Sequence, residues 1–134
     1  MSHPLTQGVH HVGLTVTDLD ASCRFFCELL GWEKVGGNPD YPAVFISDGS
    51  VMVTLWQVRQ ASTAEPFDNS NNVGLHHLAI RVADLDTLDR IYHKLVAAEN
   101  VDIEFAPEPL REGPTIHMMC FEPCGIRIEF IVPA

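Results

Sequence analysis

The chain has 134 residues, of which 46% are hydrophobic and 19% are charged, so it is long enough to bury a core and ordinary in composition for a globular protein. Its formal net charge of −10 argues against a nucleic-acid partner and against an anionic membrane surface, because both need clustered lysine and arginine. No apolar run approaches the roughly 20 residues of a membrane span, and the N-terminal residues lack the pattern of a secretory signal, so a cytoplasmic location is expected.

Residues 8–58 predict a first module with the order βαβββ. Asp18 or Asp20 is expected to cap the helix, and Gly31 to end it. The stretch Gly36–Pro39 is expected to be a loop, and Asp48-Gly49 is a typical hairpin turn. The expected elements are a strand over Val9–Thr17, a helix over Ala21–Leu30, and strands over Trp32–Val35, Ala43–Ser47 and Val51–Gln57.

A polar connection over residues 59–73 leads into a second module over residues 74–134. Asp84 or Asp86 is expected to cap its helix, and the prolines between 107 and 114 predict a loop. The expected elements are a strand over Leu75–Val82, a helix over Thr87–Ala98, and strands over Asp102–Phe105, Ile116–Phe121 and Ile126–Val132. We expect a single domain over residues 1–134 of the α+β class, with the helices packed outside a curved mixed sheet.

The two modules open with the same sequence. Residues 8–20 read GVHHVGLTVTDLD and residues 74–86 read GLHHLAIRVADLD, with a constant offset of 66 residues (74 − 8). Because two copies are too few for a solenoid, the repeat indicates a duplicated module within one domain.

Each copy carries a pair of histidines, His10-His11 and His76-His77. Successive residues of a strand point to opposite faces, so only one member of each pair is expected to face a shared cavity. One histidine from each module would form half of a metal site, since imidazole is the commonest metal ligand. The alternative is two structurally satisfied histidines.

A carboxylate lies within the last apolar strand. Glu129 is flanked by Ile128 and Phe130, and burying a carboxylate there is costly unless it is paired or bound to a metal. The alternative is an outward-facing Glu129 beside Arg127 on an amphipathic strand.

Two βαβββ modules that each open with histidine and an aliphatic strand resemble the vicinal oxygen chelate superfamily. That superfamily includes glyoxalase I, fosfomycin-resistance and bleomycin-resistance proteins, methylmalonyl-CoA epimerase and extradiol dioxygenases. The closing EPCGIRIEF is similar to its Asp-Pro-x-Gly-x-x-x-Glu signature, with Glu122 in place of Asp. The resemblance covers essentially the whole chain and implies a glyoxalase-like fold around a metal or ligand cavity.

The resemblance also implies a ligand set. By position, His11 and His77 match the histidine ligands and Glu129 matches the carboxylate ligand of one divalent ion, which is Fe, Mn, Ni or Zn. The fourth ligand position of glyoxalase I falls at Thr54 or Val53, neither of which is a convincing ligand, and this departure puts glyoxalase I activity in doubt. His10 and His76 are expected to face away and to pack under a helix.

The implied function is a metal-dependent, glyoxalase-like lyase or isomerase that chelates a small oxygen-rich metabolite. Glu129 and His117 are the candidate catalytic residues, His117 as an acid/base group or substrate contact, with a core or rim histidine as its alternative. The rival functions are a non-catalytic, bleomycin-resistance-like binding protein and a single-domain dioxygenase or thiol transferase. The resemblance further implies a homodimer.

Overall fold

A computed structural model describes residues 3–134, and the chain divides into two compact units, Met1–Arg59 and Gln60–Ala134. Each unit contains one module. Within the described residues, no helix is both long and apolar enough to cross a membrane.

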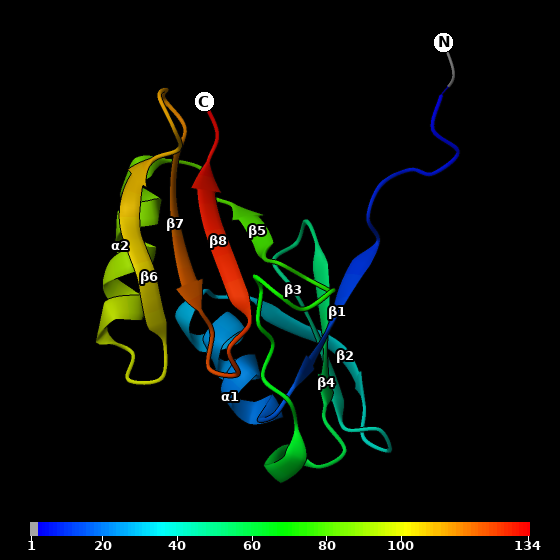
Figure 1. Cartoon of the computed structure of the whole chain (residues 1–134). Helices are drawn as coiled ribbons and strands as arrows, with labels where there is room; N and C mark the ends of the chain where they lie inside the picture. The colour runs from blue at the N-terminus through cyan, green and yellow to red at the C-terminus, as the bar shows by residue number, and fades with distance from the viewer. Residues whose placement is uncertain (1–2) are drawn as a thin grey trace. The chain divides into compact units, whose positions relative to one another are not determined.

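The first unit holds one four-stranded sheet with the order β1-β4-β3-β2 (Figure 1). Strand β1 pairs in parallel with β4, and the other pairings are antiparallel. The helix α1 connects β1 to the far edge of the sheet, so the chain returns through β3 and places β4 beside β1. The elements are β1 (His11–Val16), α1 (Leu19–Arg24), the π-helical turn η1 (Phe25–Leu29), β2 (Glu33–Asn38), β3 (Ala43–Ser47) and β4 (Met52–Gln57).

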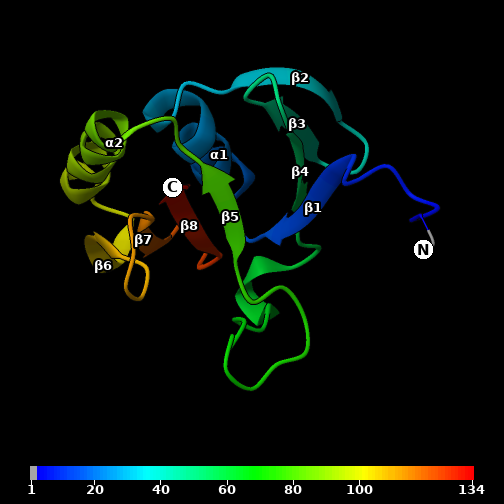
Figure 2. The same ribbon diagram turned by 90° about the horizontal axis from the view of Figure 1, so that it is seen from above.

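The second unit repeats this topology with the order β5-β8-β7-β6. Strand β5 pairs in parallel with β8, and α2 contacts β6, β7 and β8. In Figure 2, α2 lies beside β6 and β7. The elements are the short 3-10 helix η2 (Ala61–Thr63), β5 (Leu78–Arg81), α2 (Leu85–Ala97), β6 (Asp102–Pro109), β7 (Ile116–Phe121) and β8 (Arg127–Val132).

The repeated Asp-Leu-Asp caps the helix in both modules with its first aspartate. Asp18 accepts a hydrogen bond from the backbone N–H of Ala21 at 3.1 Å, and Asp84 accepts one from Thr87 at 2.8 Å. Both cap residues have extended backbone, as an N-cap requires. The offset is again 66 residues (84 − 18), so the repeat extends to its capping geometry.

Two expected loops are strands instead. β2 runs through Gly36–Asn38, and β6 continues to Pro109 through Pro107. Both strands lie at the edge of their sheets. A proline, which has no N–H, is tolerated there because the outer side of an edge strand has no neighbouring strand to bond. Register shifts between Ile103 and Glu108 also let β6 carry irregular backbone.

The last strands of the two sheets match position by position. β4 and β8 each have six residues and the same pattern of burial along the strand. Gly13 is opposite Thr54, and Ala79 is opposite Glu129, which makes Thr54 the counterpart of Glu129. The α+β fold with two βαβββ modules is therefore confirmed.

Candidate functional site

The carboxylate of Glu129 is buried at the centre of β8. Its residue is only 7% exposed, between the fully buried Ile128 and Phe130. The outward-facing alternative considered for this residue is therefore wrong. A buried carboxylate needs partners on both oxygens, because burial without them costs several kcal/mol.

Two histidines supply those partners, one on each oxygen. His77 Nε2 lies 3.3 Å from Glu129 Oε1, and His117 Nδ1 lies 2.5 Å from Glu129 Oε2. His77 immediately precedes β5, and His117 lies on β7, so the two imidazoles come from segments on the two sides of β8. The ring of His117 also packs against Phe105, with ring centroids 4.9 Å apart.

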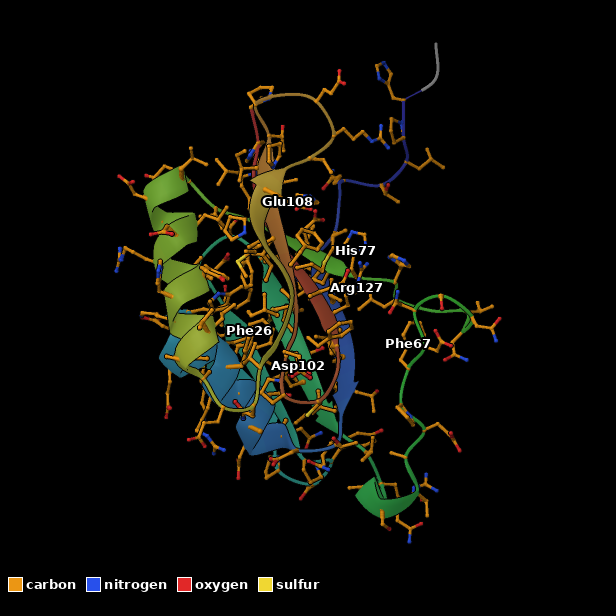
Figure 3. All side chains as sticks on the ribbon, turned by 60° about the vertical axis from the view of Figure 1, so that its left-hand side comes forward. Phe26, Phe67, His77, Asp102, Glu108 and Arg127 are labelled. Carbon is orange, nitrogen blue, oxygen red and sulfur yellow. The ribbon has the colours of Figure 1, made fainter. Side chains whose placement is uncertain are left out.

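An ion pair lies next to this group. Arg127 bonds the Glu104 carboxylate with both Nε and Nη2, at 2.8 and 2.7 Å. These bonds lower the pKa of Glu104 and raise that of Arg127. The remaining terminal nitrogen, Nη1, lies 3.2 Å from His76 Nδ1, which in turn lies 2.8 Å from His77 Nδ1. Figure 3 shows His77 and Arg127 at the neighbouring strands β5 and β8.

The expectation for His10 and His76 is wrong. Both are exposed, and each contacts the next histidine through Nδ1 rather than packing under a helix. The reason is that β5 begins at Leu78 and β1 at His11, so neither histidine pair lies wholly within a strand. The alternation of side chains that the expectation assumed does not apply there.

The corresponding position of the first unit has different chemistry. Thr54 is 3% exposed, and its hydroxyl accepts a hydrogen bond from Trp56 Nε1 at 2.9 Å. His11 is exposed, with its Nδ1 2.9 Å from that of His10. This unit therefore presents a histidine pair, but it has a hydroxyl engaged by an indole where the second unit has a carboxylate.

The pair of His77 and Glu129 fits a shared metal ion. Ligand atoms at about 2.1 Å from one ion lie about 3.0–3.4 Å apart on adjacent corners of an octahedron or a tetrahedron. The observed 3.3 Å between Nε2 and Oε1 lies in that range. An imidazole and a carboxylate also suit first-row divalent ions.

The structure brings together three of the four predicted site residues, His77, His117 and Glu129. The fourth, His11, belongs to the first unit. Among residues 3–134, no three His, Cys, Asp or Glu side chains form a ready-made metal cluster. The metal assignment to His11, His77 and Glu129 and the catalytic assignment of Glu129 and His117 therefore stay predictions.

Glu104 was not predicted from the sequence, and Arg127 was named only as the neighbour of an outward-facing Glu129. Nothing in their spacing signals the ion pair, because 23 residues separate them and β6 carries a register shift beside Glu104. Only the pairing of β6, β7 and β8 brings the two residues together.

Comparison with known proteins decides the family. Residues 8–130 match the Glyoxalase/Bleomycin resistance protein/Dioxygenase superfamily. The chain belongs to this superfamily. The vicinal oxygen chelate superfamily is another name for the same group, so the resemblance found in the sequence is confirmed.

Relatives within the superfamily have different activities. The chain is 29% identical over 155 aligned positions to a 2-epi-5-epi-valiolone epimerase from Actinomyces, covering 96% of this chain and 80% of that protein. It is 27% identical to a probable lactoylglutathione lyase from Synechocystis, covering 90% and 92%. A glyoxylase/bleomycin resistance protein/dioxygenase domain from Frankia has a TM-score of 0.80 and 25% identity, covering 96% of this chain and 99% of that one.

Proposed function

We propose that this superfamily member is a divalent-metal-dependent enzyme of the lyase or isomerase type that acts on a small oxygen-rich metabolite. The observation that supports it most is the buried Glu129 carboxylate, with the Nε2 of His77 3.3 Å from one of its oxygens. The proposed ligands are His77 and Glu129 together with the repeat-matched His11, from the same chain or from a second copy. The names of the epimerase and lyase relatives agree with this reaction class.

The ion, Fe, Mn, Ni or Zn, would supply Lewis acidity to adjacent oxygens of the substrate. The residues of the chain have separate tasks. Glu129 and His77 would hold the ion, and the hydrogen bond between His117 Nδ1 and Oε2 would fix the orientation of the Glu129 carboxylate. His117 is also the proposed acid/base group, because a proton at Oε2 would be shared with an imidazole nitrogen 2.5 Å away.

Metal analysis of protein purified without added metal tests this proposal. We expect close to one first-row ion per binding site in the wild type, and loss of that ion in Glu129→Ala and His77→Ala. The matched controls are Glu99→Ala and His93→Ala, which remove an exposed carboxylate and an exposed imidazole from the same unit. Wild-type protein that binds no metal even after incubation with each of the four ions would contradict the proposal and favour a non-catalytic binding protein.

Turnover is then measured with the loaded protein on a small panel. Methylglyoxal–thiol adducts test lyase chemistry, and 2-epi-5-epi-valiolone tests epimerisation. Fosfomycin and catechols test the rival thiol transferase and dioxygenase. We expect turnover of a methylglyoxal–thiol adduct or of 2-epi-5-epi-valiolone, and we expect His117→Ala to lose that turnover. The homodimer and the cytoplasmic location stay predictions of the sequence, and sedimentation analysis measures the former.

A further inference from the structure

Strand β5 carries an arginine on the same face of the second sheet as the candidate site. Ile80 is buried, whereas Ala79 and Arg81 on either side of it are exposed, which is the alternation of a strand with one covered face. Ala79 is the residue that pairs with Glu129. Arg81 therefore lies on the face that carries the Glu129 carboxylate, roughly 6–7 Å further along β5 than Ala79. None of the proposed tasks uses Arg81.

The guanidinium of Arg81 is not engaged by the protein. Within residues 3–134, its side chain makes no ion pair and no hydrogen bond. The other cationic residue on the described strands of the second unit is Arg127, which Glu104 neutralises with two hydrogen bonds. The backbone at Arg81 is nevertheless held in the sheet, because the next residue, Val82, donates its N–H to the carbonyl of Ile131 at 2.8 Å. The charge of Arg81 is thus fixed in place and available to a ligand.

The position between the candidate site and this arginine holds only a methyl group, that of Ala79. In the first unit the matching residue is Gly13, and the indole of Trp56 lies against it, with Nε1 3.5 Å from the place where a Cβ would lie. The residue of β8 that matches Trp56 is Ile131, which has no ring to lie over Ala79. The second unit therefore leaves this part of the sheet face open to a ligand.

We infer that Arg81 binds an anionic group of the substrate, a carboxylate or a phosphate, while other oxygens of the same molecule reach the candidate site. This inference rests on the proposed metal-dependent function and narrows its substrate class to anions. A guanidinium presents a rigid fork of N–H donors that matches the oxygens of a carboxylate or a phosphate. A group a few bonds away from the atoms that reach Glu129 can contact Arg81 by crossing Ala79. The matching residue of the first unit is Thr15, which has no charge.

Two features of the chain make this inference specific. The formal net charge of −10 repels anions, so an anionic substrate needs a local cation such as Arg81. β5 is also an edge strand, where a charged side chain discourages pairing with another chain. That protective role alone would give Arg81 no influence on the affinity of a small ligand, so ligand affinity separates the two roles.

The test uses two pairs of probes that share a chelating end. 2-Oxoglutarate has a distal carboxylate that 2-oxohexanoate replaces with an ethyl group, and 3-phosphoglycerate has a phosphate that glycerate lacks. Isothermal titration of the Zn²⁺-loaded protein measures the affinity of each probe. We expect the wild type to bind the member with the distal anion roughly tenfold more tightly in at least one pair, the lower end of the effect of a hydrogen bond to a charged group. The pair that shows the preference identifies the anion as a carboxylate or a phosphate.

Variants assign that preference to Arg81. Arg81→Gln should abolish it, and Arg81→Lys, which keeps the charge but not the fork, should retain part of it. The matched control is Arg90→Gln, which removes an exposed arginine from α2 of the same unit and should leave the preference unchanged. All three variants should bind Zn²⁺ as the wild type does, because neither arginine is a proposed ligand of the ion.

The outcomes separate this inference from the metal function. If the wild type binds Zn²⁺ but prefers neither anionic probe, or if Arg81→Gln keeps the preference or Arg90→Gln loses it, the inference is overturned and the metal function stands. If the wild type does not bind Zn²⁺, the metal function fails, and the side-chain N–H resonance of Arg81 in NMR spectra of the metal-free protein decides the inference. A saturable shift with 2-oxoglutarate or 3-phosphoglycerate, but not with the probe paired to it, would support the anion site, and the absence of such a shift would overturn it.

Discussion

The two modules place different chemistry on the same backbone frame. In each, a parallel strand pair brings the first strand of the module beside its last strand, with matching register. At the position opposite Ala79 the second module has the buried Glu129, whereas opposite Gly13 the first has the buried Thr54. The residues around this position also differ: Arg127, His117 and Glu104 in the second module correspond to Met52, Ala43 and Val35 in the first.

This difference indicates a division of roles. The second module contains every residue of the candidate site other than the proposed ligand His11, and each of them makes a hydrogen bond or an ion pair. The first module fills the corresponding position with a hydroxyl that an indole N–H satisfies. Duplication of a frame therefore predicts the position of a functional residue in both copies but not its identity, because strand pairing is made by the backbone.

Glu129→Thr, which gives the second module the residue of the first, is expected to have the largest effect. Removing a direct ligand should weaken Zn²⁺ binding by more than the roughly 10–100-fold caused by losing a group that only touches a ligand. Isothermal titration with the metal-free protein measures this change. Glu99→Thr is the control for loss of one negative charge. Unchanged affinity in Glu129→Thr would show that the carboxylate has a structural role, as Thr54 does.

His117→Ala, which copies Ala43 of the first module, is expected to have the next largest effect. The imidazole fixes Oε2 of Glu129 but leaves Oε1 to the ion, so we expect Zn²⁺ affinity to fall by roughly 10–100-fold rather than to be lost. His117→Asn, which keeps a hydrogen-bond donor, should recover part of that affinity. Equal affinity in wild type and His117→Ala would assign the residue to the core, the alternative that the sequence left open.

The sequence predicted the frame well because the signals for it are local. The capping aspartates and the hairpin turn at Asp48-Gly49 depend on neighbouring residues only, and the repeat shows the same local pattern in both modules. The errors fell where tertiary structure overrides local signals. Gly36–Asn38 and Pro107–Pro109 appeared to be loops, but edge strands accept them.

The site was predictable in part. Glu129 was identified because a carboxylate in an apolar strand is costly, and it does have partners on both oxygens. The network of Glu104, Arg127 and His76 was not identified, because it joins three segments whose proximity depends on strand register. The start of β5 after His77 was also missed, and one or two residues at a strand end decide which way a histidine points.

Thr54→Val tests the first module's side of the comparison and should affect stability rather than metal binding. Valine has the shape of threonine but cannot accept the hydrogen bond from Trp56 Nε1. We expect a loss of about 1 kcal/mol in the free energy of unfolding, because the partly exposed indole can recover some hydrogen bonding from water. Urea unfolding followed by tryptophan fluorescence measures it, and Thr54→Ser should be milder. Loss of Zn²⁺ affinity in Thr54→Val would instead make Thr54 part of the metal site.

Asp84→Ala tests the feature in which the modules agree, and its effect should be the smallest. Asp84 caps α2, and hydrogen bonds from Thr87 lower the pKa of its carboxyl below the ordinary value of 3.8. A carboxyl whose pKa is lowered in the folded state stabilises the fold at pH values above its ordinary pKa. This stabilisation is lost as the pH falls through the lowered pKa. We therefore expect Asp84→Ala to lower the urea midpoint at neutral pH, with a difference from wild type that shrinks below about pH 4.

Asp86→Ala removes the other candidate cap, which lies in the first turn of the helix, and should change the midpoint less. Equal losses in the two variants would mean that negative charge near the helix N-terminus, rather than the hydrogen bond at the cap, is what the repeated Asp-Leu-Asp provides.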